Sequence, residues 1–155
     1  MTFTKPSARR AALSLLFTAC SAALALESPP AQPKLPAVRL NAGMHLIQAE
    51  LAQTPDQRAT GMMFRKTMGA NEGMLFVFEQ PGQQCFWMQN TLLPLAIAFV
   101  GDDGSIVNLD EMKPLTQDSH CSAKPVRFVL EMNTGWFAKH GIKPGFKLQG
   151  RLFKP

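Results

Sequence analysis

The chain has 155 residues, of which 16 are lysine or arginine and 11 are aspartate or glutamate, so its net charge is +5. Lys5, Arg9 and Arg10 lie in what we interpret as an export signal, and the remainder carries about +2 after cleavage. Because that remainder lacks a cluster of basic residues with interleaved aromatic residues, we expect no nucleic-acid partner.

The N-terminus has the features of a secretory signal peptide. An apolar run at residues 11–25 follows the basic residues, and Ala23 and Ala25 provide the small residues of a cleavage site. The run is too short to cross a bilayer, which needs about 20 apolar residues. We therefore predict that residues 1–25 are removed, that the protein is periplasmic or secreted, and that it has no membrane span.

Lipidation is the alternative form of processing, because Thr18-Ala19-Cys20 resembles the end of a lipoprotein signal. Phe17 stands where such signals normally carry leucine, so the sequence favours cleavage after Ala25 over a lipid anchor at Cys20. The next segment, residues 26–36, contains four prolines and is predicted to be a stiff tether with nothing to pack against. The remaining residues, 37–155, are predicted to form a single β-rich domain.

Short apolar or alternating runs separated by turn signals dominate this domain. We predict strands at residues 44–51, 73–78, 85–88, 95–100, 105–109, 126–132 and 146–153. A short helix is predicted to begin at Thr54-Pro55, with Gln57 completing a capping box, and one or two helical turns are predicted at 134–140. Pro81-Gly82 predicts a turn, residues 101–104 predict a hairpin, and residues 110–124 predict a long loop. The fold class is therefore mostly β: a small antiparallel sandwich or barrel-like domain with one or two short helices.

Two cysteines, Cys85 and Cys121, remain after cleavage. An even number of cysteines in an oxidising compartment favours a disulfide, so we predict a Cys85–Cys121 bridge.

Several blocks in this region resemble a known family. Gly61-Met62-Met63-Phe64-Arg65, residues 73–78 (GMLFVF), residues 86–91 (FWMQNT), Pro94-Leu95 and residues 129–131 (VLE) follow one another in order. Together they resemble domain of unknown function family 192, over about residues 42–153. The resemblance implies an all-β or nearly all-β fold, often secreted, without an established activity. The sequence departs from the family pattern at Ala96, where members usually carry aspartate, so no role of that carboxylate transfers to this chain.

The candidate ligand-binding residues are Arg65, Trp87, Asn90, Thr91 and Glu131. An aromatic face with a few fixed polar groups is typical of a small-molecule or sugar pocket. The alternative is structural: Arg65 and Glu131 would form an ion pair, while Asn90 and Thr91 would satisfy backbone groups at the end of a strand. If the residues form a pocket, Arg65 and Asn90 should approach each other, with Trp87 in contact.

The sequence contains no recognisable catalytic motif, so we lean away from an enzyme, and catalytic residues remain unassigned. The best interpretation is an exported module that binds a small ligand or a cell-envelope component. A hydrolase directed at the envelope is the first alternative. Periplasmic copper handling through methionine and histidine is the second, because thioethers suit Cu(I), although methionine is also a common core residue. No cofactor is predicted and no metal ligands are assigned.

Overall fold

The computed structural model describes residues 29–153. The predicted signal peptide, its cleavage site and the lipidation alternative at Cys20 lie outside the described residues. Within that range the protein is mostly β with two short helices, as predicted, and its sheets are not closed into a barrel.

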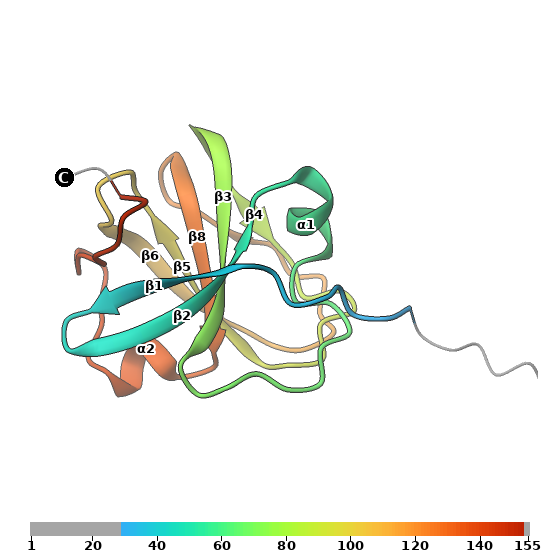
Figure 1. The fold of residues 1–155 in the computed structure, drawn as a ribbon. Coiled ribbons are helices and arrows are strands. Elements are labelled where there is room, and N and C mark those ends of the chain that lie inside the picture. Colours follow the sequence, from blue (N-terminus) through green and yellow to red (C-terminus); the bar gives the residue numbers. More distant parts are fainter. Residues whose placement is uncertain (1–28, 154–155) are drawn as a thin grey trace, which may run out of the picture.

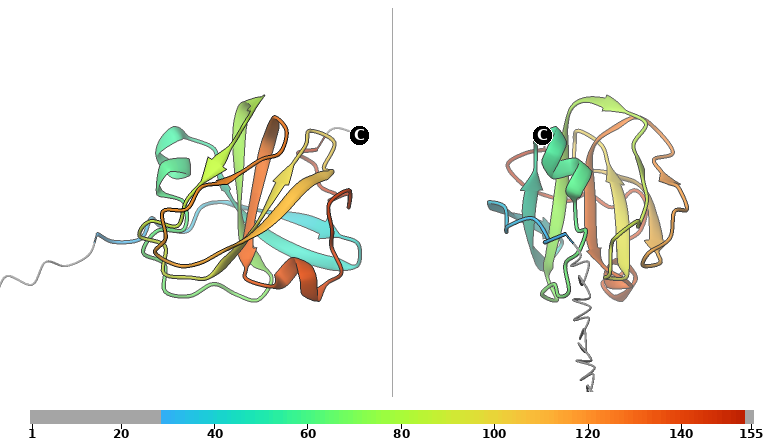
Figure 2. Two further views of the ribbon diagram at one scale, coloured as in Figure 1. Left: turned by 180° about the vertical axis from the view of Figure 1, so that it is seen from behind. Right: turned by 90° about the vertical axis from the view of Figure 1, so that its right-hand side faces the viewer.

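Eight strands and two helices make up the described fold (Figure 1). The strands are β1 (Ala37–Ala42), β2 (His45–Ala52), β3 (Glu72–Gly82), β4 (Cys85–Phe86), β5 (Leu95–Val100), β6 (Ile106–Met112), β7 (His120–Cys121) and β8 (Val126–Asn133). The helices are α1 (Pro55–Thr60) and α2 (Trp136–Lys139), which lie at opposite ends of the molecule (Figures 1 and 2).

The main sheet has six strands in the order β1-β2-β3-β8-β5-β6, while β4 and β7 form a separate two-stranded sheet. The β1–β2 hairpin runs across the direction of β3 and β8 (Figure 1), as expected for a strongly twisted sheet. All pairs are antiparallel except β2 and β3, which are parallel and joined by a crossover through α1. This crossover returns the chain over one face of the sheet, and it later supplies part of the candidate site.

Local sequence signals explain α1 and the β5–β6 hairpin. Thr54 caps the helix by accepting a hydrogen bond from the Gln57 amide, and the Gln57 side chain accepts one from the Thr54 amide, so the predicted capping box is confirmed. The hairpin predicted at residues 101–104 is also confirmed, with Gly104 at a φ of +85°. A glycine suits this position, because a Cβ there would collide with the Leu148 carbonyl oxygen.

Three predictions about the chain path are wrong. Residues 146–153 are not a strand, since they make only two isolated bridges, Asn41 with Gln149 and Ser105 with Lys147. The segment contacts two separate parts of the chain, so no continuous ladder forms. The predicted turn at Pro81-Gly82 lies inside β3, and the predicted loop at 110–124 contains the end of β6 and all of β7.

The segment before β1 also differs from the predicted tether. The Gln32 side chain donates hydrogen bonds to the carbonyl oxygens of Gln57 and Gly61, at the end of α1. The Leu35 amide donates to Glu50 Oε2 at 2.8 Å. The expectation that this segment packs against nothing is therefore wrong for residues 32–35, since free carbonyl groups at a helix end attract donors.

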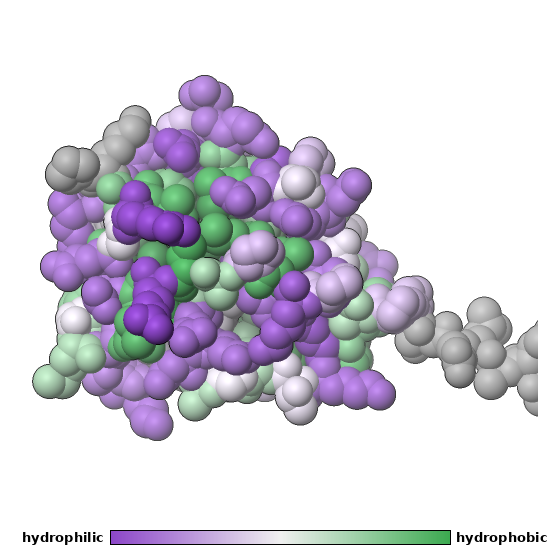
Figure 3. Space-filling view, in the orientation of Figure 1, coloured by the Kyte–Doolittle hydropathy of each residue, from purple (hydrophilic) through white to green (hydrophobic). Residues whose placement is uncertain are grey.

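Both faces of the main sheet are covered by apolar side chains, which explains the continuous apolar runs of its central strands. All six residues of β5 are buried. One face packs on α2 and the C-terminal segment, and we call this cluster the α2-side core; it includes Leu75, Phe128, Leu130 and Trp136. The other face forms the pocket-side core, which includes Met74, Phe76, Ile97, Phe99 and Val129. On the outside, Figure 3 shows a band of hydrophobic residues between hydrophilic ones, over the region where β1 and β2 meet β3.

Candidate functional site

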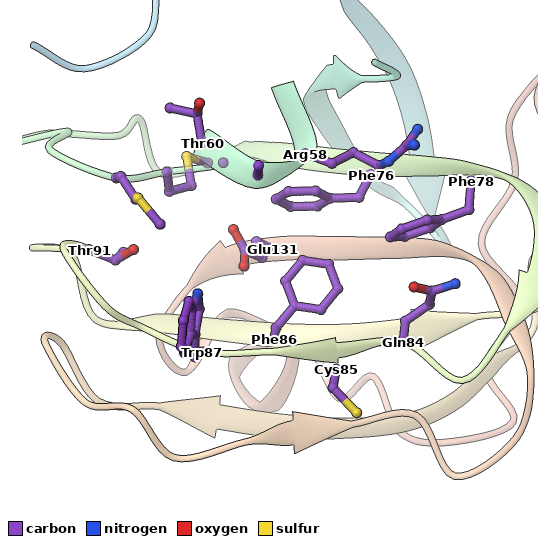
Figure 4. Close-up of a pocket in the computed structure, with 14 residues that line it drawn as sticks. Arg58, Thr60, Phe76, Phe78, Gln84, Cys85, Phe86, Trp87, Thr91 and Glu131 are labelled. Carbon is purple, nitrogen blue, oxygen red and sulfur yellow. The ribbon is translucent and has the colours of Figure 1, made fainter. Parts of the chain in front are cut away.

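A pocket of about 280 Å³ opens at the edge of the pocket-side core, between α1 and β4 (Figure 4). Phe76 and Phe78 of β3 line one wall, and Phe86 and Trp87, at the end of β4, line the other. Thr91 and the turn after α1, which carries Met62 and Met63, complete the lining. The pocket therefore has aromatic walls together with several polar groups, a combination found in small-molecule sites.

Glu131 of β8 is the one acidic side chain among the described lining residues. Glu131 is only 4% exposed. Its carboxyl reaches into the space between Trp87 and Phe86 on one side and Phe76 on the other (Figure 4). On the neighbouring strands it lies opposite Met74 and Ile97, both fully buried and apolar.

No hydrogen bond or ion pair reaches the Glu131 carboxyl from any described residue. Burial raises its pKa from 4.5 to about 8, because a charged carboxylate loses its hydration there. An unpartnered carboxyl in a pocket is costly for stability and is therefore a marker of a functional site.

The outer wall of the pocket is fixed by the predicted disulfide. Cys85 and Cys121 are bonded, with their Cα atoms 4.1 Å apart, and they pair directly across the β4–β7 ladder. The Gln84 amide also donates to Ser122 Oγ, and the Ser122 amide donates to the Gln84 carbonyl. These contacts hold the strand that carries Phe86 and Trp87.

The rim and mouth of the pocket remain open to solvent. Trp87 is 53% exposed, although the next residue, Met88, is buried at 1%. Gly61, at the end of α1, has a φ of +49°, and a Cβ there would lie 3.3 Å from the Phe76 ring. A side chain at Gly61 would therefore crowd the Phe76 wall.

The five predicted ligand-binding residues are only partly brought together. Trp87, Thr91 and Glu131 line the same pocket, whereas Arg65 and Asn90 are not among its lining residues. The Asn90 carbonyl accepts a hydrogen bond from the Phe64 amide at 2.9 Å, and Asn90 has a φ of +60°. Its observed contact is thus a backbone contact at a turn.

Arg65 forms its ion pair with Glu50 and not with Glu131. Its two terminal nitrogens, Nη1 and Nη2, donate to Glu50 Oε1 and Oε2 at 2.6 and 2.7 Å, and both side chains are 9% exposed. The predicted Arg65–Glu131 pair is therefore wrong, because β2, and not β8, is the strand beside the loop after α1. Arg65 is thus part of a buried ion pair, as the structural alternative expected, but its partner is Glu50.

Sequence reasoning missed the aromatic walls and Glu50. Phe76 and Phe86 lie in apolar runs that predict core positions, so the sequence pattern did not indicate that their side chains line a pocket. Glu50 is the single charged residue of β2, a strand with three buried apolar residues. A lone acidic residue in such a strand predicts a basic partner.

The histidines do not gather around the methionines that line or underlie the pocket. His45 and His140 contact each other with ring centroids 4.2 Å apart, beside Trp136 in the α2-side core. His120 contacts Asp110, with Nδ1 and Oδ2 2.6 Å apart. Within residues 29–153, no three His, Cys, Asp or Glu side chains come together in a way that could hold a metal ion.

In the same part of the chain, no helix is long and apolar enough to cross a membrane. Ala96, where the sequence departs from the family pattern, is fully buried in the α2-side core and does not line the pocket.

Two solved structures are similar to this chain along most of their length. One, a protein of unknown function from Novosphingobium aromaticivorans, is 37% identical with a TM-score of 0.72, over 81% of this chain and 94% of that one. The other, a putative transcription regulator from Sinorhizobium meliloti, is 37% identical with a TM-score of 0.69, over 74% and 92%. No curated protein shows significant similarity to the sequence. The model of the family described as "Uncharacterized ACR" (DUF192) matches residues 38–150. The chain therefore belongs to domain of unknown function family 192.

Proposed function

We propose that this protein is an exported binding module that takes up a small organic ligand in the pocket between α1 and β4. The observation that carries the proposal is the Glu131 carboxyl, buried without a partner in a cavity walled by aromatic side chains. A volume of about 280 Å³ suits a compact molecule with an apolar body and one polar group. In this proposal Trp87, Thr91 and Glu131 contact the ligand, while Arg65 supports the fold.

The disulfide supports the exported part of the proposal, since such bonds persist mainly in oxidising compartments. We accordingly place the mature protein in the periplasm or outside the cell, after removal of residues 1–25. A partner in the cell envelope remains compatible with this location.

Hydrolysis and copper handling receive no specific support from the pocket. Glycoside hydrolysis needs two opposed carboxyl groups, and Glu131 is the single carboxyl among the described lining residues. A copper site would need converging methionine and histidine donors, whereas His45 and His140 contact each other and His120 contacts Asp110.

The binding proposal is tested with 2-phenylethanol, a neutral aromatic alcohol that fits the cavity. Titration followed by backbone amide NMR should shift the signals of residues 58–63 and 84–87. Two exposed helix alanines provide matched blocking variants: Ala59 lines this pocket, and Ala138 lines a separate groove between α2 and β6.

Ala59→Phe should weaken binding of 2-phenylethanol, whereas Ala138→Phe should leave it unchanged. The proposal fails if high concentrations of 2-phenylethanol shift the NMR signals of neither residues 58–63 nor residues 84–87. It also fails if Ala138→Phe is the variant that blocks binding.

A further inference from the structure

Three carboxyl groups on the pocket side of the main sheet lie in one row, and the middle one has no basic partner among residues 29–153. Strand register places one residue from each of five strands in this row: Glu50, Met74, Glu131, Ile97 and Asp110. Glu50 is paired with Arg65, and Asp110 contacts His120. Glu131 lies two strands, about 10 Å, from each of them.

The fold therefore supplies a basic side chain to each outer carboxyl, Arg65 to Glu50 and His120 to Asp110, and leaves Glu131 facing the pocket without one. Neither neighbour in the row can provide it, since Met74 and Ile97 are apolar and fully buried. A ligand that enters the pocket is the remaining source of a positive charge for this carboxyl.

Arg58, the other charged side chain that lines the pocket, is already engaged. Its guanidinium donates to the Val77 carbonyl at 2.9 Å, forms an ion pair with Glu79 at 3.3 Å, and lies over the Phe78 ring at 5.0 Å. An anionic ligand would thus find no free cation among the described residues that line the pocket, which disfavours carboxylates and phosphates.

The walls of the pocket favour a cation for a separate reason. The faces of aromatic rings carry partial negative charge and attract ammonium groups, and Trp is the best of the rings in this respect. Phe76, Phe86 and the half-exposed Trp87 surround the Glu131 carboxyl (Figure 4). A carboxylate together with several aromatic rings is the donor set that suits an organic ammonium ion.

We propose, building on the function proposed above, that the pocket binds a small molecule with a single protonated amino group on an apolar or aromatic body. The ammonium group pairs with the Glu131 carboxylate at the floor, and the body packs between Phe76, Phe86 and Trp87.

Binding of such a ligand is coupled to a proton. In the empty pocket the Glu131 carboxyl holds its proton at neutral pH, because burial raises its pKa to about 8. When the ammonium ion binds, the carboxyl releases that proton to solvent, and the resulting carboxylate pairs with the ligand. Apparent affinity for the amine should therefore rise by about tenfold per pH unit below that pKa.

Other titrating groups near the row do not replace Glu131 in this coupling. Arg65 lowers the pKa of Glu50, and Arg58 is engaged by the Val77 carbonyl and by Glu79. Asp110 of β6, two strands from β8, contacts His120 of β7, and neither residue lines the pocket.

The experiment compares phenethylamine with 2-phenylethanol, which share a skeleton and differ in charge. Binding to the full mature protein is measured by NMR titration at pH 6 and pH 8. At pH 8 we expect the amine to bind at least about tenfold more tightly than the alcohol, and its affinity should fall at pH 6 while that of the alcohol stays constant.

Glu131→Gln should abolish the preference for the amine and its pH dependence while retaining the alcohol. Glu131→Met, which makes the middle of the row apolar, provides a second variant with the same expectation. Equal affinity of the wild type for both probes, or a preference that survives in both variants, overturns the amine proposal and leaves the binding proposal standing. If neither probe binds the wild type, both proposals fall.

Discussion

Removal of the Arg65 side chain is the sharpest test of how this fold is held together. Arg65→Ala leaves the Glu50 carboxylate buried with a single hydrogen bond, from the Leu35 amide. Because both side chains are only 9% exposed, we expect the substitution to lower the free energy of unfolding by about 3–5 kcal/mol. For a domain of roughly 120 residues that corresponds to a fall in Tm of about 10–20 °C.

The pH dependence gives this prediction a second readout. Burial acts to raise the pKa of Glu50, but the hydrogen bonds from Arg65 and Leu35 and the Arg65 charge outweigh it and hold the pKa below 4.5. The native pKa is thus lower than the unfolded one, so the stabilisation is present above pH 4.5 and is lost on further acidification. In Arg65→Ala the effect of burial dominates and Glu50 takes up a proton more readily. The difference in the free energy of unfolding between Arg65→Ala and the wild type should therefore become smaller as the pH falls toward 4.

Urea unfolding at pH 7 and pH 4 measures both quantities. The exposed ion pair between Lys34 and Glu72 provides the control, and Lys34→Ala should cost at most about 1 kcal/mol. The double variant Glu50→Met/Arg65→Met removes both charges and should recover most of the loss. The reasoning would be refuted if Arg65→Ala lowered the free energy of unfolding no more than Lys34→Ala does. It would also be refuted if the loss in Arg65→Ala were as large at pH 4 as at pH 7.

Two further predictions concern the pocket. The native pKa of Glu131, about 8, lies above its unfolded value, so wild-type stability should fall as the pH rises from 5 to 8, by up to about 1.4 kcal/mol per pH unit. Glu131→Gln should remove this part of the slope in urea titrations; identical slopes in the two proteins would contradict the assigned pKa. Replacing both Cys85 and Cys121 with serine should lower the free energy of unfolding by about 3–4 kcal/mol. Iodoacetamide should add no mass to the mature protein, which lacks Cys20, when that protein is denatured without reduction. Two alkylated cysteines in that sample would show that the bond is absent.

Features set by neighbouring residues could be predicted from the sequence. Thr54, Pro55 and Gln57 specify the start of α1 within four positions, and the turn at residues 101–104 specifies the β5–β6 hairpin. The disulfide followed from the number of cysteines that remain after cleavage.

Features set by distant pairing could not be predicted in the same way. The partner of Arg65 depends on the parallel pairing of β2 with β3, which places Glu50 beside the returning crossover. Alternation along β8 correctly separates Glu131 from Phe128, but it cannot reveal that apolar side chains cover both faces. Trp87, Thr91 and Glu131, which were predicted from the sequence, therefore line one pocket, whereas the sequence pattern placed Phe76 and Phe86 in the core.

The bond between Cys85 and Cys121 also has a consequence for the timing of ligand capture. For a chain exported as we propose, thiols stay reduced during synthesis. Non-covalent contacts alone then hold the outer wall, among them the two residue pairs of β4 and β7 and the hydrogen bonds of Gln84 with Ser122 and of Asn108 with Cys121. The six-stranded sheet carries neither cysteine and can form without the bridge. The wall becomes locked only after the chain reaches an oxidising compartment. The precursor would thus cross the membrane with its binding surface unfinished, and molecules abundant in the cytoplasm would not be carried out with it.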